Sequence, residues 1–341
     1  MYTDLRPGSP LSIALNAPAL ASLAIDSRQP RIMTLAHSEY SRAVLRTNQA
    51  LYDPKEYLTD DTLASVLLLG LFEIISFDEE TVQASWNAHL SGALELVKLR
   101  GAEQLNTNVG LELYVAVLLG IRTISVRRQM KLPQWVMDFE HSASDILDGH
   151  PTYHLRHIFD SFSDIQQGQY MGTISTVEMI SDCLQLDQII TSTCVQSLPN
   201  DLIGMITADT HEILRIRQLS TLRIIRIQLN CWIQEHASQF GLASPMTSLE
   251  DSKQLYSKAH ETMKAVAVKI LESTQQFLIP PVTLNSRFII FYLYSIVQQP
   301  LMPGELKTRT RELIRAIGLE SNIPEALRAT ERLDRQRGHN G

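Results

Sequence analysis

The chain has 341 residues, of which 44% are apolar and 20% are charged, so it can bury a sizeable core and is not disordered as a whole. Thirty Lys and Arg residues against 37 Asp and Glu give a net charge of −7, which excludes the basic footprint that non-specific nucleic-acid binding requires. With only 15 glycines and 14 prolines, the composition favours helices over a turn-rich β architecture.

The first part of the chain shows helical patterns. Residues 9–26 are small and apolar with two prolines, and we expect an entry segment with a short helix there. Apolar side chains recur about every fourth residue over 31–51, which predicts a helix that ends before Pro54. The next run opens with Thr59 and two aspartates, a typical helix start, and is apolar on nearly all sides through Ile75. Such a helix belongs in the centre of a bundle.

Two further helices carry start and stop signals. Ser76 and Glu79 have the spacing of a capping box, and the helix that they begin has basic residues in its last turn and stops at Gly101. Thr107 or Asn106 is expected to cap another helix that runs to about residue 129.

Periodicity is weakest over residues 138–172, where Gly, Pro, Asp and Ser are frequent. We expect a connecting segment there, broken by one short helix around 154–162. It joins an N-terminal helical part, 1–137, to a C-terminal helical part, 173–337, that packs on the first to give one continuous regulatory domain. No repeat of fixed period occurs. The predicted fold class is all-α, an irregular multi-helix bundle.

The sequence has no motif for catalysis, a metal, a cofactor or a membrane. Three cysteines, Cys183, Cys194 and Cys231, are too few and too widely spaced for a zinc cluster or a disulfide framework. The His-Glu pairs at 211–212 and 260–261 lack the second histidine of a zinc-protease helix, and no phosphate loop or esterase elbow occurs. The uncharged apolar stretch over residues 62–72 has 11 residues, against about 20 needed to span a bilayer. With no secretory signal at the start, an intracellular protein is expected.

Clusters of ionisable residues have ordinary structural explanations. Pro151 interrupts the helical spacing of three nearby histidines, so surface or helix-end positions are favoured for His150, His154 and His157. Basic residues gather at one helix end and along one long helix: Arg122, Arg127, Arg128 and Lys131, then Arg215, Arg217, Arg223 and Arg226. Residues 305–337 mix eight basic with six acidic residues and are expected to form a solvated helix surface.

One helix face combines unusual residues. Trp86, His89 and Gly92 are three residues apart and project to roughly the same side of the helix that stops at Gly101. A mid-helix glycine costs about 1 kcal/mol relative to alanine, which the close approach of a second helix would offset. We therefore expect a tight helix crossing, with Trp86 filling volume and His89 bonded to a neighbouring helix end. Together with Arg100 these residues form the motif face, a structural or effector contact.

Three runs carry a resemblance to a known family, namely residues 40–51, 60–73 and 85–101, the last with W-x-x-H-x-x-G and an Arg-Gly helix end. They resemble the fungal-specific transcription factor domain, the helical region that follows the zinc binuclear cluster in many fungal regulators. The likeness is good over residues 11–135, and afterwards only the helical character continues. The resemblance implies a transcription regulator in the nucleus, for metabolic or secondary-metabolite genes. Its expected partners are other proteins or a second copy, with a small-molecule effector.

The family's six-cysteine DNA-reading module has no counterpart, because no cysteine precedes residue 183. Three explanations are open: an incomplete gene prediction, a fragment, or a natural relative that acts through protein contacts. The chain as given is expected not to bind DNA directly. The alternative function is a helical accessory protein or enzyme of a biosynthetic pathway, which would need ionisable groups that converge on His89. A pure interaction scaffold would instead expose a large apolar groove.

Overall fold

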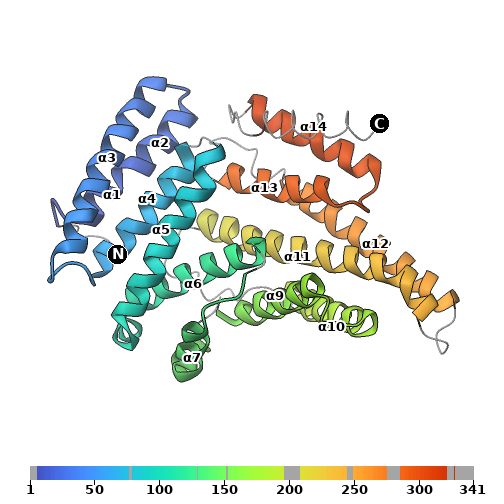
Figure 1. The fold of residues 1–341 in the computed structure, drawn as a ribbon. Coiled ribbons are helices and arrows are strands. Elements are labelled where there is room, and N and C mark those ends of the chain that lie inside the picture. Colours follow the sequence, from blue (N-terminus) through green and yellow to red (C-terminus); the bar gives the residue numbers. More distant parts are fainter. Residues whose placement is uncertain are drawn as a thin grey trace. The chain divides into compact units, whose positions relative to one another are not determined.

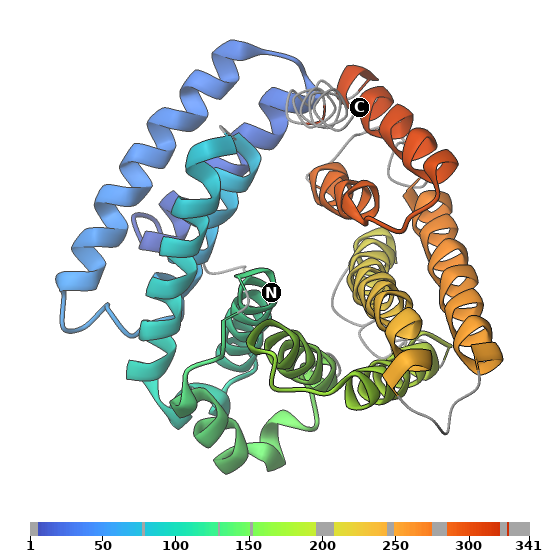
Figure 2. The same ribbon diagram turned by 45° about the vertical axis from the view of Figure 1, so that its right-hand side comes forward.

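The computed structural model describes residues 6–76, 79–128, 130–150, 153–195, 208–243, 249–274, 285–320 and 326. Over these residues the chain is helical with short connections and contains no strand, which confirms the all-α class (Figures 1 and 2). The chain divides into two compact units, Met1–Tyr153 and His154–Gly341, and each has its own apolar core.

The first unit is built around one apolar helix. Its main helices are α1 (Pro10–Ala14), α2 (Asn16–Asp26), α3 (Pro30–Tyr52), α4 (Asp60–Ser76), α5 (Glu79–Arg100) and α6 (Asn108–Arg128). The α4 helix packs against all five others, and its Leu63, Phe72 and Ile75 side chains are buried. Because neighbours surround α4, nearly all of its sides can be apolar, and the prediction of a central helix is confirmed.

Helix ends in this unit follow the predicted signals. Thr59 Oγ1 accepts a hydrogen bond from the backbone N–H of Thr62 at 3.3 Å, and Thr107 Oγ1 accepts one from Gly110 at 3.0 Å. The α5 helix ends before Gly101, whose φ of 62° is a left-handed conformation that favours glycine. The predicted capping box of Ser76 and Glu79 stays a prediction, because Ser76 is the last residue of α4 and the Glu79 side chain lies outside the described residues.

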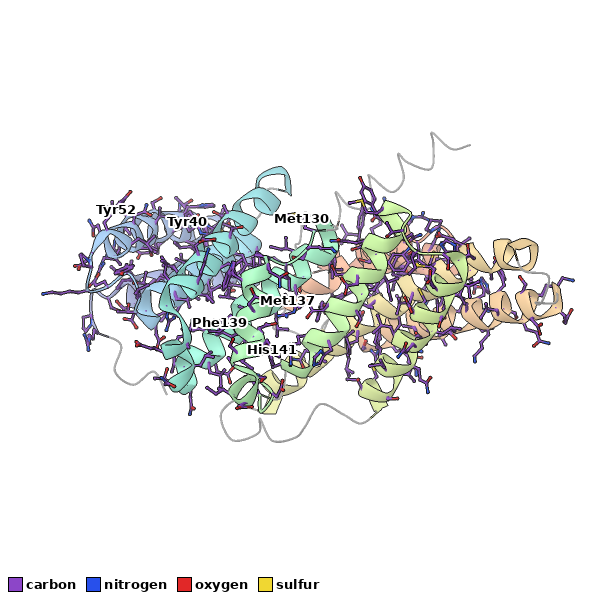
Figure 3. The ribbon with its side chains drawn as sticks, turned by 60° about the horizontal axis from the view of Figure 1, so that its bottom comes forward. Tyr40, Tyr52, Met130, Met137, Phe139 and His141 are labelled. Atoms are coloured by element: carbon purple, nitrogen blue, oxygen red, sulfur yellow. The ribbon has the colours of Figure 1, made fainter. Side chains whose placement is uncertain are left out.

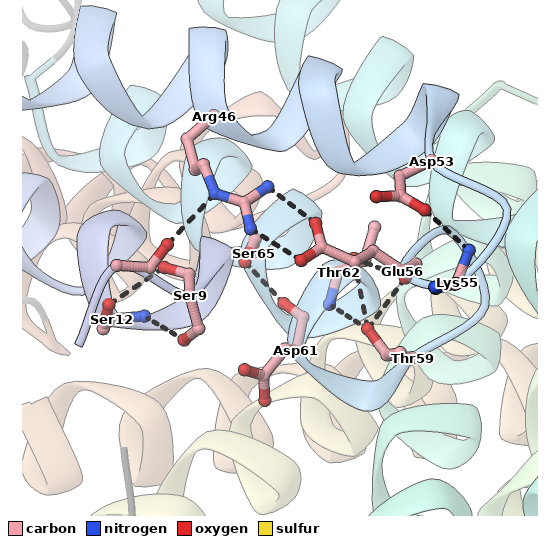
Figure 4. A network of polar contacts seen from close by, with 11 residues as sticks. Ser9, Ser12, Arg46, Asp53, Lys55, Glu56, Thr59, Asp61, Thr62 and Ser65 are labelled. Atoms are coloured by element: carbon pink, nitrogen blue, oxygen red, sulfur yellow. Dashed lines mark hydrogen bonds and ion pairs between the residues drawn. The ribbon is translucent and has the colours of Figure 1, made fainter. Parts of the chain in front are cut away.

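A polar network ties the start of the chain to α3 (Figure 4). The Arg46 guanidinium donates to the carbonyl of Gly8 at 3.0 Å and forms a bidentate pair with Glu56 at 2.8 and 2.9 Å. Thr62 donates to the Glu56 carbonyl at 2.8 Å, which adds the start of α4 to the network. These contacts hold α1, α3 and α4 in one arrangement.

The prediction of an entry segment with one short helix over 9–26 is wrong, because α1 and α2 occupy almost all of it. Ala14, Ala17 and Ala21 are fully buried, so small side chains let these helices approach α3 and α4 closely. Pro10 and Pro18 lie in first turns, where a helix tolerates proline because those backbone N–H groups need no helical partner.

Residues 138–172 are also more helical than expected. They include the end of α7 (Gln134–Ser142), α8 (Ser144–Leu147) and α9 (Arg156–Met171), so the expectation of a connecting segment with one short helix is wrong. Gly168 lies inside α9 and does not break it. Its missing side chain leaves room for Ile174 when the chain folds back after the helix, because a Cβ on residue 168 would lie only 3.2 Å from Ile174. Only Gly172, with a φ of 64°, ends the helix. The boundary between the units falls within this segment.

The second unit has α11 (Ala208–Ala243) at its centre. This helix packs against α10 (Thr176–Val195), α12 (Leu249–Thr274) and α13 (Asn285–Gln298), and α13 packs against α14 (Gly304–Glu320). The core cluster contains buried side chains from four helices, α11, α12, α13 and α14, for example Cys231, Met263, Leu293 and Ile314. Between α10 and α11, the Asp187 carboxylate accepts two hydrogen bonds from Arg226, at 2.9 and 3.1 Å.

One segment of α6, Asn108–Val126, is long and apolar enough to cross a membrane, with a mean hydropathy of 1.7. The segment is not an uncharged run, because Glu112 and Arg122 interrupt the apolar residues. In the structure 44% of the segment is buried, and Arg122 forms a buried ion pair with Glu140 of α7. The core helix of a folded unit has the same length and composition.

Burial predicts low reactivity for two of the three thiols. Cys183 and Cys231 are fully buried, and desolvation raises the pKa of each thiol to about 12, whereas Cys194 is half-buried. Because the thiolate is the reactive form, we expect a disulfide reagent at pH 8 to label Cys194 first and the other two only after denaturation. Mass spectrometry of the labelled peptides checks the order. Labelling of Cys183 or Cys231 in the native chain at the rate of a free thiol would contradict it.

Candidate functional site

The motif face lies on α5, and the structure describes three of its four residues in full. Trp86 is on the helix, but its side chain lies outside the described residues. The His89 side chain is 22% exposed, Gly92 is exposed, and the Arg100 side chain is 6% exposed. The four residues therefore do not share one environment.

The predicted tight crossing at Gly92 is wrong. No described atom lies within 4 Å of the position that a Cβ would take there. The close contact between α5 and its neighbour is instead made by Gly120 of α6, where a Cβ would lie 2.8 Å from the side chain of Leu90. The glycine that permits the approach is thus on the partner helix, and Leu90 rather than Gly92 faces it.

His89 belongs to a cluster of three ionisable side chains from three helices. Its Nε2 lies 3.3 Å from Oε1 of Glu73 on α4 and 3.5 Å from the hydroxyl of Tyr40 on α3. The Tyr40 hydroxyl also donates a hydrogen bond to the same Glu73 oxygen. Tyr40, Glu73 and His89 are called the His89 cluster below. Because α3, α4 and α5 each contribute one member, the cluster fixes their mutual arrangement.

The surroundings of Tyr40 favour the protonated form of its hydroxyl. Burial, and then the hydrogen bond to and negative charge of Glu73, raise the pKa of the Tyr40 hydroxyl well above its usual range. The Tyr40 ring stacks on Phe72 with centroids 4.4 Å apart, and the His37 ring meets the same Phe72 edge-on at 5.3 Å. Tyr40 is thus a protonated hydrogen-bond donor whose ring packs on Phe72. Tyr52, at the end of α3, is by contrast 90% exposed (Figure 3).

Arg100 forms a separate anchor. Its Nη2 donates to the carboxylate of Asp60 at the start of α4, whereas its buried Nη1 has no hydrogen-bond partner among the described residues. Eleven residues of helix separate Arg100 from His89, or about 16 Å along the axis. The motif face therefore holds two contacts between α4 and α5, and it does not gather its residues into one site.

The other clusters singled out in the sequence are dispersed. His150 is buried and bonds through Nε2 to Glu112 at 3.1 Å, which lowers the pKa of that carboxyl, whereas His157 is exposed. The side chains of His154 and of residues 208–217 lie outside the described residues. His260 bonds to Gln234 at 3.1 Å. Over the described chain, no group of three or more His, Cys, Asp or Glu could hold a metal ion.

Three arginines of the basic stretches have contacts inside the fold, whereas the side chains of Arg127, Arg128, Arg215 and Arg217 lie outside the described residues. Arg122 is inside the core with Glu140, and Arg226 is held by Asp187. Arg223 donates to the hydroxyl of Ser273 at 3.1 Å. Each of these three guanidinium groups connects helices within its own unit, and the three do not form a continuous basic surface.

Sequence reasoning found His89 but missed the roles of Tyr40 and Glu73. Both lie in the runs that carry the family resemblance, 40–51 and 60–73, although neither has a spacing that marks it. The structure shows that these runs and 85–101 are the three helices joined by the His89 cluster.

Comparison with known proteins identifies one family. The model of the fungal specific transcription factor domain matches residues 17–267, which include parts of both units and extend well beyond the region of visible likeness. No curated protein and no solved structure matches the chain. The match covers more than half of the chain and all three runs, and it supports a general role in the regulation of transcription. The chain belongs to the fungal-specific transcription factor domain family.

Proposed function

We propose that the chain is a regulatory domain that modulates transcription in the nucleus through protein partners or a homodimer, under the control of a small-molecule effector, and without binding DNA directly. The observation that carries this proposal is the family match over residues 17–267. Metabolic or secondary-metabolite genes are the proposed targets. No residue is assigned a catalytic role.

The surface of the first unit supports protein contacts. On α3, Leu35, Leu45 and Tyr52 are 50%, 62% and 90% exposed. With about 100° per residue, all three lie within an arc of about 100° on the side away from the buried Ala43 and Thr47. Ser38, Arg42 and Gln49 are exposed within the same arc, so the face mixes polar with apolar side chains. Its three large apolar side chains would be buried by a partner that docks there.

Absence of direct DNA binding is a testable part of the proposal. The net charge of −7 repels a duplex, and described arginines such as Arg122 and Arg226 are already paired with carboxylates. We expect fluorescence anisotropy with a labelled duplex to show no salt-sensitive binding by the purified chain. A specific nanomolar interaction that weakens as salt is raised would refute this part of the proposal.

Regulatory activity itself is tested by tethering. The whole chain is fused to an unrelated DNA-binding domain and expressed in a fungal host that carries two reporters, one with low and one with high basal transcription. We expect transcription of at least one reporter to change relative to the DNA-binding domain alone. Unchanged transcription of both, at equal protein level, would contradict the proposed function.

The His89 cluster is the observation that favours the alternative, an enzyme or accessory protein of a biosynthetic pathway. His89 has two ionisable neighbours, Tyr40 and Glu73, as a catalytic site would require. Glu73→Gln separates the two functions, because glutamine still accepts the hydrogen bond from Tyr40 but cannot take up a proton. The regulatory proposal predicts unchanged activity of the tethered Glu73→Gln chain. The enzyme would instead show turnover of a substrate that Glu73→Gln abolishes at an unchanged melting temperature, with no shift of the tethered reporter by either protein.

A further inference from the structure

Three cations lie on one face of α14, the helix drawn in red in Figure 1. Lys307, Arg311 and Arg315 are each four residues apart, so with about 100° per residue they fall within an arc of about 80°. Arg309 is about 160° away from Lys307 and Arg311 and about 120° away from Arg315 on the same helix, and Glu312 is turned away from all three by about 60° or more. The face is therefore uniformly basic, although residues 305–337 as a whole mix both signs of charge.

Two of these cations are half-buried without a compensating carboxylate among the described residues. Lys307 and Arg311 are of intermediate exposure, and neither forms an ion pair with a described carboxylate. Lys307 Nζ donates to the carbonyl of Pro300 at 3.2 Å, and the buried Nε of Arg311 has no hydrogen-bond partner among the described residues. Both groups thus retain donors for a further acceptor.

The electrostatics agree with the geometry. Desolvation, and then the positive charge of Arg311, lower the pKa of Lys307, whereas the Cys231 thiol nearby on α11 has the opposite influence. Partial burial of two neighbouring cations is unfavourable unless an anion joins them. Local arrangements that are unfavourable in the free protein are expected mainly at functional sites.

We propose that Lys307 and Arg311, with Arg315 at the rim, bind a small oxyanion with at least two negative oxygens, of the phosphate-monoester or dicarboxylate type. The ammonium group supplies a compact charge, and the guanidinium group supplies a planar pair of donors that fits two oxygens of one ligand. A small anion fits better than a nucleic acid, because the net charge of −7 repels a long polyanion. This inference goes beyond the proposed function, and it can fail while the regulatory role stands.

The test uses the whole purified chain with inorganic phosphate and with succinate, each compared with chloride at constant ionic strength. Isothermal titration is expected to show binding of at least one of the two oxyanions. Arg311→Gln and Lys307→Gln should each weaken that binding by about tenfold or more, because each removes a charged donor. Arg309→Gln is the matched control, since it removes the same charge from the opposite side of α14 and should leave the binding unchanged.

Stability provides a second measurement that does not depend on affinity. In chloride, Lys307→Gln is expected to melt at the same temperature as the unchanged chain or higher, because it removes repulsion from Arg311. In a saturating concentration of the bound oxyanion, the unchanged chain should melt higher than this variant. The proposal is overturned if neither oxyanion binds, if all three variants bind equally, or if Arg311→Gln abolishes binding to a duplex in place of a small anion.

Discussion

Replacing Glu140 with glutamine is expected to lower the free energy of unfolding of the first unit by about 3–5 kcal/mol. Glu140 accepts two hydrogen bonds from Arg122, at 2.9 and 2.6 Å, and the two side chains are only 6% and 1% exposed. Glutamine has the same size but no charge, so the guanidinium would remain in the core without its compensating carboxylate. Urea denaturation followed by circular dichroism measures the loss.

Two comparisons make this prediction specific to the buried charge. Glu39→Gln breaks an ion pair whose partner, Arg42, has a side chain that is 62% exposed, and it should cost about 1 kcal/mol or less. Replacing Arg122 with methionine and Glu140 with leucine together should recover most of the loss, because the core then contains no charge. Equal losses for Glu140→Gln and Glu39→Gln would show that the Arg122 pair is not a buried one.

A second large effect is expected from Gly110→Ala at the start of α6. A Cβ there would lie 2.0 Å from the backbone carbonyl oxygen of Gln104 and 2.8 Å from Thr107 Oγ1. A carbonyl in the preceding turn cannot rotate away as a flexible side chain would, so the backbone itself must shift. We expect a loss of about 3 kcal/mol, at the upper end of the usual cost of overpacking, and a weakened cap from Thr107. The same denaturation experiment measures it.

The same substitution in α5 gives the matched control. Gly92 is exposed, with no described atom near the position of a Cβ, and alanine favours a helix by about 1 kcal/mol. Gly92→Ala is therefore expected to stabilise the first unit by about 0.5–1 kcal/mol. If Gly92→Ala destabilised the chain as much as Gly110→Ala, a helix would have to approach α5 at Gly92 after all.

Local signals were enough to predict many of the helices. The apolar run of α4 could only be buried on all sides, and Thr59, Thr107 and Gly101 mark helix ends through their own backbone chemistry. Glycine inside a helix was more difficult to interpret. Gly92, Gly168 and Gly172 look alike in sequence, yet one is exposed, one is packed against Ile174 and one ends a helix.

The candidate site could be predicted only in part, because its contacts are tertiary. His89 was identified from its spacing with Trp86, but its partners lie 49 and 16 residues earlier in the chain. Likewise, Arg122 was grouped with the basic residues of a helix end, and nothing in the sequence pairs it with Glu140 on α7. Helical periodicity tells which face of a helix is buried, but not which residue of another helix meets it.

The most direct test of the account is transcription from a tethered reporter, measured with the unchanged chain, Gly92→Ala and Gly110→Ala side by side. If the packed helices of the first unit act on transcription, the unchanged chain and Gly92→Ala will shift the reporter equally, and Gly110→Ala will lose most of the shift. A reporter that stays at the level of the DNA-binding domain alone with all three proteins, each present in equal amount, would contradict the account.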